Sequence, residues 1–297
     1  DMHQQVASSH DTSSKIAIVT DSGCDIQYDT HNSNIHIVPV RYSFGDKEYI
    51  DKISQTTEQF YNELKTNPVH PKTSQPPIGD FLNKYENLST HYKSIISIHI
   101  PEKISGTLQS ARNAKKKIEN FNITDIDSCS ASVGLGLIIK SASKLARESD
   151  DHDRVVGKIK SLIKNTQMFL TVNDLNYAIK GGRVPKYKGV ISKALRLHPI
   201  LTFDEEGKLK AASVLFGAKN LHKKFAKFIL KQLDKNSHYN LSIAHSNAET
   251  EGHELMDIIE NSFNNIVNID LVDMGSALGV HGGPNSFVVG VQKKVNE

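Results

Sequence analysis

The sequence predicts an α/β protein with two lobes, a mostly parallel sheet in the first lobe and a mixed sheet in the second. Short apolar runs alternate with segments of helical period along most of the chain, which is typical of βαβ units. Polar or glycine-rich residues follow several of these runs, where the ligand loops of open α/β sheets lie. Residues 204–207 (Asp-Glu-Glu-Gly) separate two strand-like segments and predict a hairpin, which makes the second sheet mixed.

The first lobe is expected to span residues 15–153. Its apolar runs are nearly continuous, as in strands buried on both faces of a parallel sheet. They predict strands at 15–20, 35–40, 94–100 and 123–127, and helical period predicts helices at 59–65, 78–85, 108–118 and 133–147. Residues 1–14 lack the apolar stretch of a signal peptide and are expected to be a disordered leader.

The second lobe is expected to span residues 154–297, after a charged stretch at 148–153. Apolar runs predict strands at 168–172, 197–203, 208–215, 241–245, 267–272 and 286–291. Helical period predicts helices at 155–163, 176–183, 221–233 and 254–263. Residues 275–284, rich in glycine and small side chains, are expected to form a loop that carries His281.

Composition excludes several classes of function. The chain has 297 residues and a formal net charge of +3, and its densest basic cluster, residues 115–117, fits a solvated helix face, so nucleic acid is not an expected partner. Cys24 and Cys129 make neither a disulfide framework nor a zinc site, and they fit a reducing, cytoplasmic compartment. No apolar run is long enough to span a bilayer, and no metal or other cofactor is expected.

The stretch of residues 72–79 (Lys-Thr-Ser-Gln-Pro-Pro-Ile-Gly) reads as a hydroxyl-rich loop before a helix. Prolines suit the first turn of a helix, where a missing N–H is not needed. Thr73 and Ser74 offer hydroxyls, and free backbone N–H groups there can cradle an anion. The plainer interpretation is an ordinary helix cap; Ser74 could cap the helix while Thr73 faces a ligand.

A second hydroxyl loop, Ser105-Gly106-Thr107, follows another predicted strand, and Gly106 would let a ligand approach the backbone closely. Hydroxyls with no lysine or arginine nearby suit a carboxylate or an ester better than a polyphosphate. Residues 21–25 (Asp-Ser-Gly-Cys-Asp) also follow a strand, but their spacing does not fit a phosphatase. We expect their carboxylates to bind backbone N–H groups and Cys24 to be inert.

Two further residues are candidates. His281 lies among glycines that leave it room, and its imidazole could donate to a carboxylate. Arg183 follows two glycines and is expected on an exposed, mobile turn, either as a solvated helix end or as a docking or phosphate contact.

These stretches together resemble the DegV family, the fatty-acid-binding subunits of bacterial fatty acid kinase systems. The resemblance covers residues 15–294 and rests on six pieces in family order: residues 18–22 (Ile-Val-Thr-Asp-Ser), 73–76 (Thr-Ser-Gln-Pro), 105–111 with Ser-Gly-Thr and Ser-Ala, 181–183 (Gly-Gly-Arg), 198–201 (His-Pro-Ile-Leu) and 281–284 (His-Gly-Gly-Pro).

The resemblance implies a two-lobed protein that buries a long-chain fatty acid, such as palmitate, stearate or oleate, in a tunnel at the lobe junction. Its carboxylate would be held by Thr73, Ser74, the 105–107 loop (Ser105, Gly106, Thr107), His281 and Gly282. The family does not catalyse alone: a separate kinase, related to dihydroxyacetone kinases, phosphorylates the bound acid, and the carrier passes the acyl phosphate to phospholipid synthesis. Arg183 would dock this kinase. Aliphatic residues such as Leu135, Leu137, Ile138 and Ile139 could line the tunnel or fill a packed core.

Three departures from the family pattern concern partner docking more than lipid binding. Phe216 and Ala218 stand where basic residues are usual, His198 stands where lysine is common, and Asn285 replaces a glycine. The alternative function is an acyl hydrolase or acyltransferase that uses Ser105 as nucleophile and His281 as base.

Overall fold

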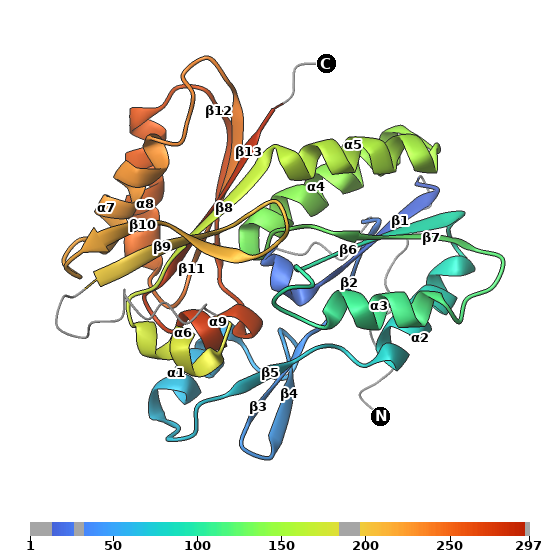
Figure 1. Ribbon diagram of the computed structural model, residues 1–297, viewed down its shortest axis with the longest axis horizontal. Helices are drawn as coiled ribbons and strands as arrows, with labels where there is room; N and C mark the ends of the chain where they lie inside the picture. Colours follow the sequence, from blue (N-terminus) through green and yellow to red (C-terminus); the bar gives the residue numbers. More distant parts are fainter. Residues whose placement is uncertain (1–13, 27–32, 184–196, 295–297) are drawn as a thin grey trace.

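The computed structural model describes residues 14–26, 33–183 and 197–294. A four-stranded, fully parallel sheet with the strand order β2-β1-β6-β7 forms the N-terminal part (Figure 1). Its strands are β1 (Ile16–Asp21), β2 (Ile35–Val38), β6 (Ser94–His99) and β7 (Asn122–Asp127). Every residue of β1 and β6 is buried, as their continuous apolar runs predict.

Helices cover both faces of this sheet. Apolar residues of α2 (Ile78–Ser89) and α3 (Thr107–Lys115) pack on one face, and those of α4 (Ser132–Glu148) and α5 (His152–Lys164) pack on the other. The core around α4 also includes Met168 and Val288 of the second sheet. This helix therefore lies between the two sheets (Figure 1).

A six-stranded sheet with the order β10-β9-β8-β13-β11-β12 forms the C-terminal part. Its strands are β8 (Thr166–Thr171), β9 (Leu197–Phe203), β10 (Leu209–Phe216), β11 (Tyr239–His245), β12 (Ile266–Asp273) and β13 (Phe287–Lys293). Only the β11–β12 pair is parallel among the pairings of this sheet, and β9 and β10 form the predicted hairpin. The prediction of a parallel first sheet and a mixed second sheet is confirmed.

Two helices, α7 (Leu221–Leu230) and α8 (Glu249–Ser262), cover the outer face of the six-stranded sheet, where Phe225, Ile229 and Leu255 are fully buried. Two short helices lie at the end of this sheet nearest the N-terminal part: α6 (Leu175–Gly181) and α9 (Ser276–Gly282), which pack against each other. The predicted loop at residues 275–284 is therefore mostly a helix.

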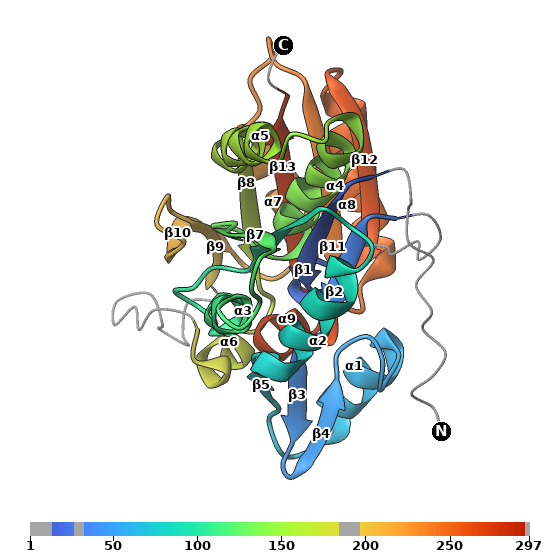
Figure 2. The same ribbon diagram turned by 90° about the vertical axis from the view of Figure 1, so that its right-hand side faces the viewer.

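A third sheet, with the order β4-β3-β5, is absent from the sequence prediction. It comprises β3 (Arg41–Phe44), β4 (Lys47–Ile50) and β5 (Lys72–Ser74), all antiparallel. It packs with α1 (Thr57–Thr66) and with Val280 of α9, and Figure 2 shows it below α9. The predicted loop at Thr73 and Ser74 is thus a strand.

The caps also differ from the prediction. Helix α2 begins at Ile78 after Pro77 and receives no side-chain cap, so Ser74 does not cap it.

Residues 1–13 of the expected leader lie outside the described residues. Ser14 belongs to the fold, because it is buried and donates to the carbonyl of Ala146 at 3.0 Å.

The interpretation of residues 21–25 as a structural turn is confirmed. Asp21 accepts the N–H groups of Gly23 and Ile100 at 3.0 and 3.1 Å, and Asp25 accepts the N–H of Gly275 at 2.8 Å. Burial raises the pKa of the Cys24 thiol to about 12, so this thiol stays protonated and unreactive at neutral pH.

Candidate functional site

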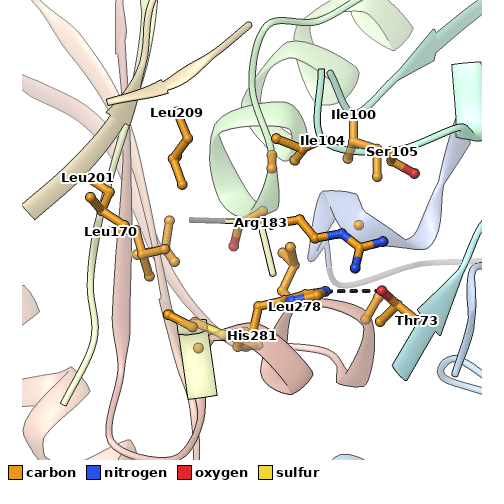
Figure 3. Close-up of a pocket in the computed structure, with 18 of the residues that line it drawn as sticks. Thr73, Ile100, Ile104, Ser105, Leu170, Arg183, Leu201, Leu209, Leu278 and His281 are labelled. Atoms are coloured by element: carbon orange, nitrogen blue, oxygen red, sulfur yellow. Dashed lines mark hydrogen bonds between the residues drawn. The ribbon is translucent and has the colours of Figure 1, made fainter. Parts of the chain in front are cut away.

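A cavity lies between the N-terminal part and the six-stranded sheet. Its empty volume is about 1000 Å³, counting the space at its opening. Side chains of strands β8, β9, β10 and β13 form an apolar wall that includes Leu170, Leu201, Leu209 and Val288. Figure 3 shows Leu170, Leu201 and Leu209 on one side, facing Ile100, Ile104 and a set of polar side chains on the other.

The polar end of the cavity joins two distant parts of the chain. Thr73 of β5 and His281 of α9 both line it, and their Oγ1 and Nε2 atoms lie 3.0 Å apart (Figure 3). Thr73 reaches this position because β5 pairs with β3, where Thr73 lies opposite Tyr42. Ser74 and Gly282 line the same cavity. The exposed Ser74 brings this end to the surface.

His281 lies in helix α9 rather than in an open loop. Burial, with smaller effects from Arg183 and His70, lowers the pKa of the His281 imidazole to about 4, so this ring is neutral at pH 7. Its Nδ1 atom is buried and has no hydrogen-bond partner among the described residues. A Cβ atom at position 181 would lie 2.2 Å from this Nδ1. The imidazole therefore fits against α6 only because residue 181 is a glycine.

Arg183 also lines the cavity. Gly182 ends α6 with a φ of 71°, and the Arg183 guanidinium then donates to the carbonyl of Gly181 at 3.0 Å. Figure 3 shows the guanidinium directed toward the side of the cavity that carries Thr73 and Ser105. Arg183 is exposed, as expected, although this hydrogen bond holds it against the end of α6. The expectation that the hydroxyls have no arginine nearby is wrong, because Arg183 lines the same cavity as Thr73 and Ser105.

The second hydroxyl loop contributes through Ser105 alone. Ser105 lines the cavity, and its hydroxyl lies 2.8 Å from that of Thr107, which is fully buried and does not line it. The side chain of Gln75 packs against Gly106, because a Cβ atom added to Gly106 would lie 2.9 Å from it. A ligand would reach the backbone of Gly106 only if the exposed side chain of Gln75, which also lines the cavity, moved aside.

The apolar lining differs from the one that the sequence suggested. Leu135, Ile138 and Ile139 are fully buried in the packed core around α4, and Leu137 is 5% exposed. None of the four is among the residues that line the cavity. Three of the lining leucines, Leu170, Leu201 and Leu209, come from the six-stranded sheet, and Leu278 comes from α9. The alternation of side chains along these strands predicts that the sheet has two faces. It does not predict which of the two faces lines a cavity.

The structure does not pair Ser105 with His281 as a nucleophile and its base. The Ser105 hydroxyl bonds to Thr107, and the His281 Nε2 atom bonds to Thr73. No observation therefore favours the acyl hydrolase or acyltransferase. A search of the described ranges finds no group of three or more His, Cys, Asp or Glu side chains that could hold a metal ion.

The fold and the cavity together define a class: an α/β protein of two main sheets that encloses a largely apolar cavity with a polar end. Within that class, this chain belongs to the DegV family, since the family model described as "Uncharacterised protein, DegV family" matches residues 15–294. Asn285 has a φ of 58°, a conformation that asparagine tolerates better than most residues.

Curated relatives match the chain over nearly its full length. The DegV domain-containing protein SAR1438 of Staphylococcus aureus is 33% identical over 288 residues, which are 94% of this chain and 99% of that protein. The DegV domain-containing protein CA_C1624 of Clostridium acetobutylicum is 31% identical over 282 residues, with the same coverage.

Solved structures share the fold. One is described as the fatty acid binding DegV family protein SAG1342 from Streptococcus agalactiae, with a TM-score of 0.84, 26% identity, and coverage of 95% of this chain and 100% of that one. Another is described as DegV, a fatty acid binding protein from Bacillus subtilis, with a TM-score of 0.84, 25% identity and the same coverage. A third, a stearic acid-binding protein from Eubacterium ventriosum, has a TM-score of 0.83 and 25% identity, and covers 94% of this chain and 98% of that one.

Proposed function

We propose that this protein binds a long-chain fatty acid, such as palmitate, stearate or oleate, with the acyl chain in the cavity and the carboxylate at its polar end. One observation carries the proposal: a cavity walled by Leu170, Leu201 and Leu209 ends at the Thr73–His281 pair. The fatty acid binding stated for the three similar structures supports the same ligand class.

The energetics of an acyl chain fit this lining. Burial of a CH₂ group contributes about 0.8 kcal/mol, so the chain of a 16-carbon acid gains roughly 10 kcal/mol when it leaves water. A fatty acid therefore favours an enclosed apolar cavity, and the leucines of the six-stranded sheet offer such a surface.

The carboxylate needs donors to offset the loss of its hydration, about two or three for a buried group. Thr73, Ser74 and Ser105 offer hydroxyls, a neutral imidazole on His281 offers one N–H, and Arg183 adds a positive charge. In the proposed complex Gly282 lets the head group approach α9. Gly106 and Thr107 act indirectly, because Gly106 leaves room for Gln75 and Thr107 holds the Ser105 hydroxyl.

We further propose that the protein acts in the cytoplasm as the binding subunit of a fatty acid kinase system. A separate kinase would phosphorylate the bound acid, and the acyl phosphate would feed phospholipid synthesis. The exposed Ser74 and Gln75 at the polar end support access to the head group. Phe216 is 70% exposed and Ala218 is exposed, so this kinase would meet an apolar contact where the family pattern has basic ones.

The binding proposal is tested by native mass spectrometry of the purified protein, followed by titration of the delipidated protein with oleate. A co-purifying long-chain acid and saturable oleate binding are expected. Methyl oleate is the matched control ligand, because it has the same chain without the charge. Failure to bind any of oleate, stearate and palmitate, or equal affinity for oleate and methyl oleate, would contradict the proposed function. The kinase role requires that labelled ATP and the kinase yield acyl phosphate only when this protein is present.

A further inference from the structure

Helix α9, which carries His281, is bound at its beginning by two carboxylates from the N-terminal part of the chain. The N–H of Gly275 donates to Asp25 Oδ1 at 2.8 Å, and the N–H of Ala277 donates to Asp51 Oδ1 at 3.3 Å. Asp25 and Asp51 are each 1% exposed. These bonds connect residues that are 250 and 226 positions apart in the sequence.

This helix has few means of its own to form. It spans seven residues, its N-cap Gly275 has no side chain to accept a hydrogen bond, and helices of this length are marginal in water. The free N–H groups of a first turn need acceptors, and negative charge at that end stabilises a helix. Asp25 and Asp51 supply such acceptors from elsewhere in the fold.

The surrounding contacts make the position of α9 specific. Tyr61 donates to the carbonyl of Met274 at 3.1 Å, just before the helix. A Cβ atom on Gly279 would lie 2.7 Å from atoms of both Phe60 and Tyr61, so α9 packs directly against α1. A displacement at the beginning of such a short, close-packed helix is therefore carried to His281 near its end.

Asp25 also links α9 to the cavity wall. Its Oδ2 accepts the hydroxyl of Ser132 at 2.8 Å, and Ser132 lines the cavity. Its Oδ1 lies 3.4 Å from the ammonium nitrogen of Lys52, which offsets the charge of the buried carboxylate. One carboxylate thus holds the beginnings of α4 and α9 together at the cavity.

We infer that Asp25 and Asp51 are positioning residues for the head-group end of the cavity, because they hold α9 in the place from which His281 meets Thr73. The inference rests on the proposed function for its effect on ligand affinity. Its structural part, the dependence of the His281 environment on the two carboxylates, also holds for the ligand-free protein.

The test compares Asp51→Ala, Asp51→Asn and a control, Asp125→Ala. Asp125 is a half-buried carboxylate on β7 that pairs with Arg112 and Lys115 of α3, and it does not line the cavity. Two quantities are measured: oleate affinity, and the ¹⁵N chemical shifts of the His281 ring, assigned with His281→Gln. Asp51→Ala is expected to lower oleate affinity about tenfold and to shift the His281 signals in the ligand-free protein. Asp51→Asn keeps an acceptor oxygen and is expected to restore both.

The control variant Asp125→Ala distinguishes an effect on the position of His281 from a general loss of stability. It is expected to lower the melting temperature and to leave the oleate affinity and the His281 chemical shifts unchanged. The inference would be overturned if folded Asp51→Ala protein had the same His281 chemical shifts as the wild type. It would also be overturned if Asp51→Asn did not restore the His281 chemical shifts and the oleate affinity. If Asp51→Ala does not fold, hydrogen exchange of the wild-type protein decides: the amides of Gly275 and Ala277 are expected to be protected, and fast exchange overturns the inference. A wild-type protein that binds none of oleate, stearate and palmitate disproves the proposed function, while the His281 signals still test the positioning.

Discussion

The Nε2 atom of His281 and the Oγ1 atom of Thr73 lie 3.0 Å apart, although the two residues are separated by 208 positions in the chain. The contact joins the short helix α9 to the edge of the third sheet at the polar end of the cavity (Figure 3). Each partner can bond a carboxylate, and each orients the other while no ligand is bound. Predictions about ligand binding follow from this pair and its neighbours.

Replacement of Thr73 by valine keeps the shape of the side chain and removes its hydroxyl. In the proposed complex this hydroxyl bonds a charged head group, so we expect oleate binding to weaken by about 1.5–3 kcal/mol. Isothermal titration calorimetry measures the loss. Thr66→Val, which removes the hydroxyl at the exposed end of α1, should leave oleate affinity unchanged. Wild-type affinity in Thr73→Val would exclude Thr73 from the head-group site.

The Ser105→Ala variant is expected to retain lipid less well by about 1–3 kcal/mol, the cost of a lost hydrogen bond to a charged group. The fold should survive, because within the described part of the chain the Ser105 hydroxyl forms hydrogen bonds only with Thr107, two residues away. Competition with a fluorescent fatty acid, together with a melting curve, checks both expectations. Ser89→Ala on α2 is the matched control, since its hydroxyl bonds only the carbonyl of Glu86. Lipid retention equal in the two variants would remove Ser105 from the site.

The buried imidazole of His281 should make the ligand-free protein less stable in acid. Its pKa is about 4 in the folded protein and about 6.5 in an unfolded chain, so the unfolded state binds more protons between these values. Stability should fall as the pH drops from 6.5 to 4, by up to about 3 kcal/mol from this group.

Urea unfolding at pH 7, 6 and 5 measures this effect as the difference between wild type and His281→Gln. A bound carboxylate favours the protonated ring and raises the pKa of His281, so bound oleate should reduce the loss. Identical pH dependence in the two proteins would show that His281 does not titrate in this way.

Gly181→Ala tests the contact between α6 and α9. The added methyl group would lie 2.2 Å from His281 Nδ1, so the imidazole must move away from Thr73 and oleate affinity should fall about tenfold or more. Gly157→Ala in helix α5 is the control, because among the described residues nothing outside the adjacent backbone of its own helix lies within 4 Å of the new methyl group. The control should gain about 0.5–1 kcal/mol of stability from helix propensity and bind oleate normally. Unchanged binding in Gly181→Ala would contradict the packing described for His281.

Arg183→Gln removes the positive charge beside the hydroxyls. Because this side chain is partly exposed, the expected loss of oleate affinity is about 0.5–1 kcal/mol at low salt, and it should disappear as salt is added. Arg154→Gln on the exposed side of α5 should change nothing. A salt-independent loss would indicate that Arg183 acts by packing rather than by charge.

Sequence reasoning was strongest where local pattern and burial agree. The apolar runs of β1 and β6, the β9–β10 hairpin and the long helix α4 all lie where their patterns predict them. It was weakest for elements that depend on distant partners. Helix α9 has a glycine-rich sequence with no cap of its own, and its acceptors, Asp25 and Asp51, come from the other part of the chain.

The third sheet was missed for a related reason. Its strands are only three or four residues long, and a segment such as Lys72–Ser74 has too few residues for a period to be seen. The segment Lys72–Ser74 is a strand because it pairs with Arg41–Phe44. Arg183 was recognised as an exposed candidate, but nothing in a Gly-Gly-Arg turn reveals that its side chain also lines the cavity.

The two kinds of sheet, the order of their elements and the hydroxyl and imidazole side chains available for an anion can be predicted from the amino-acid sequence, because they follow from local composition and period. Which of these side chains meet depends on the three-dimensional fold. It placed Thr73 against His281, covered Gly106 with Gln75 and turned Arg183 into the cavity. It also built the apolar wall from Leu170, Leu201 and Leu209 and left Leu135 in a packed core. A buried leucine looks the same in sequence whether it faces a core or a cavity, since the difference lies in what packs opposite.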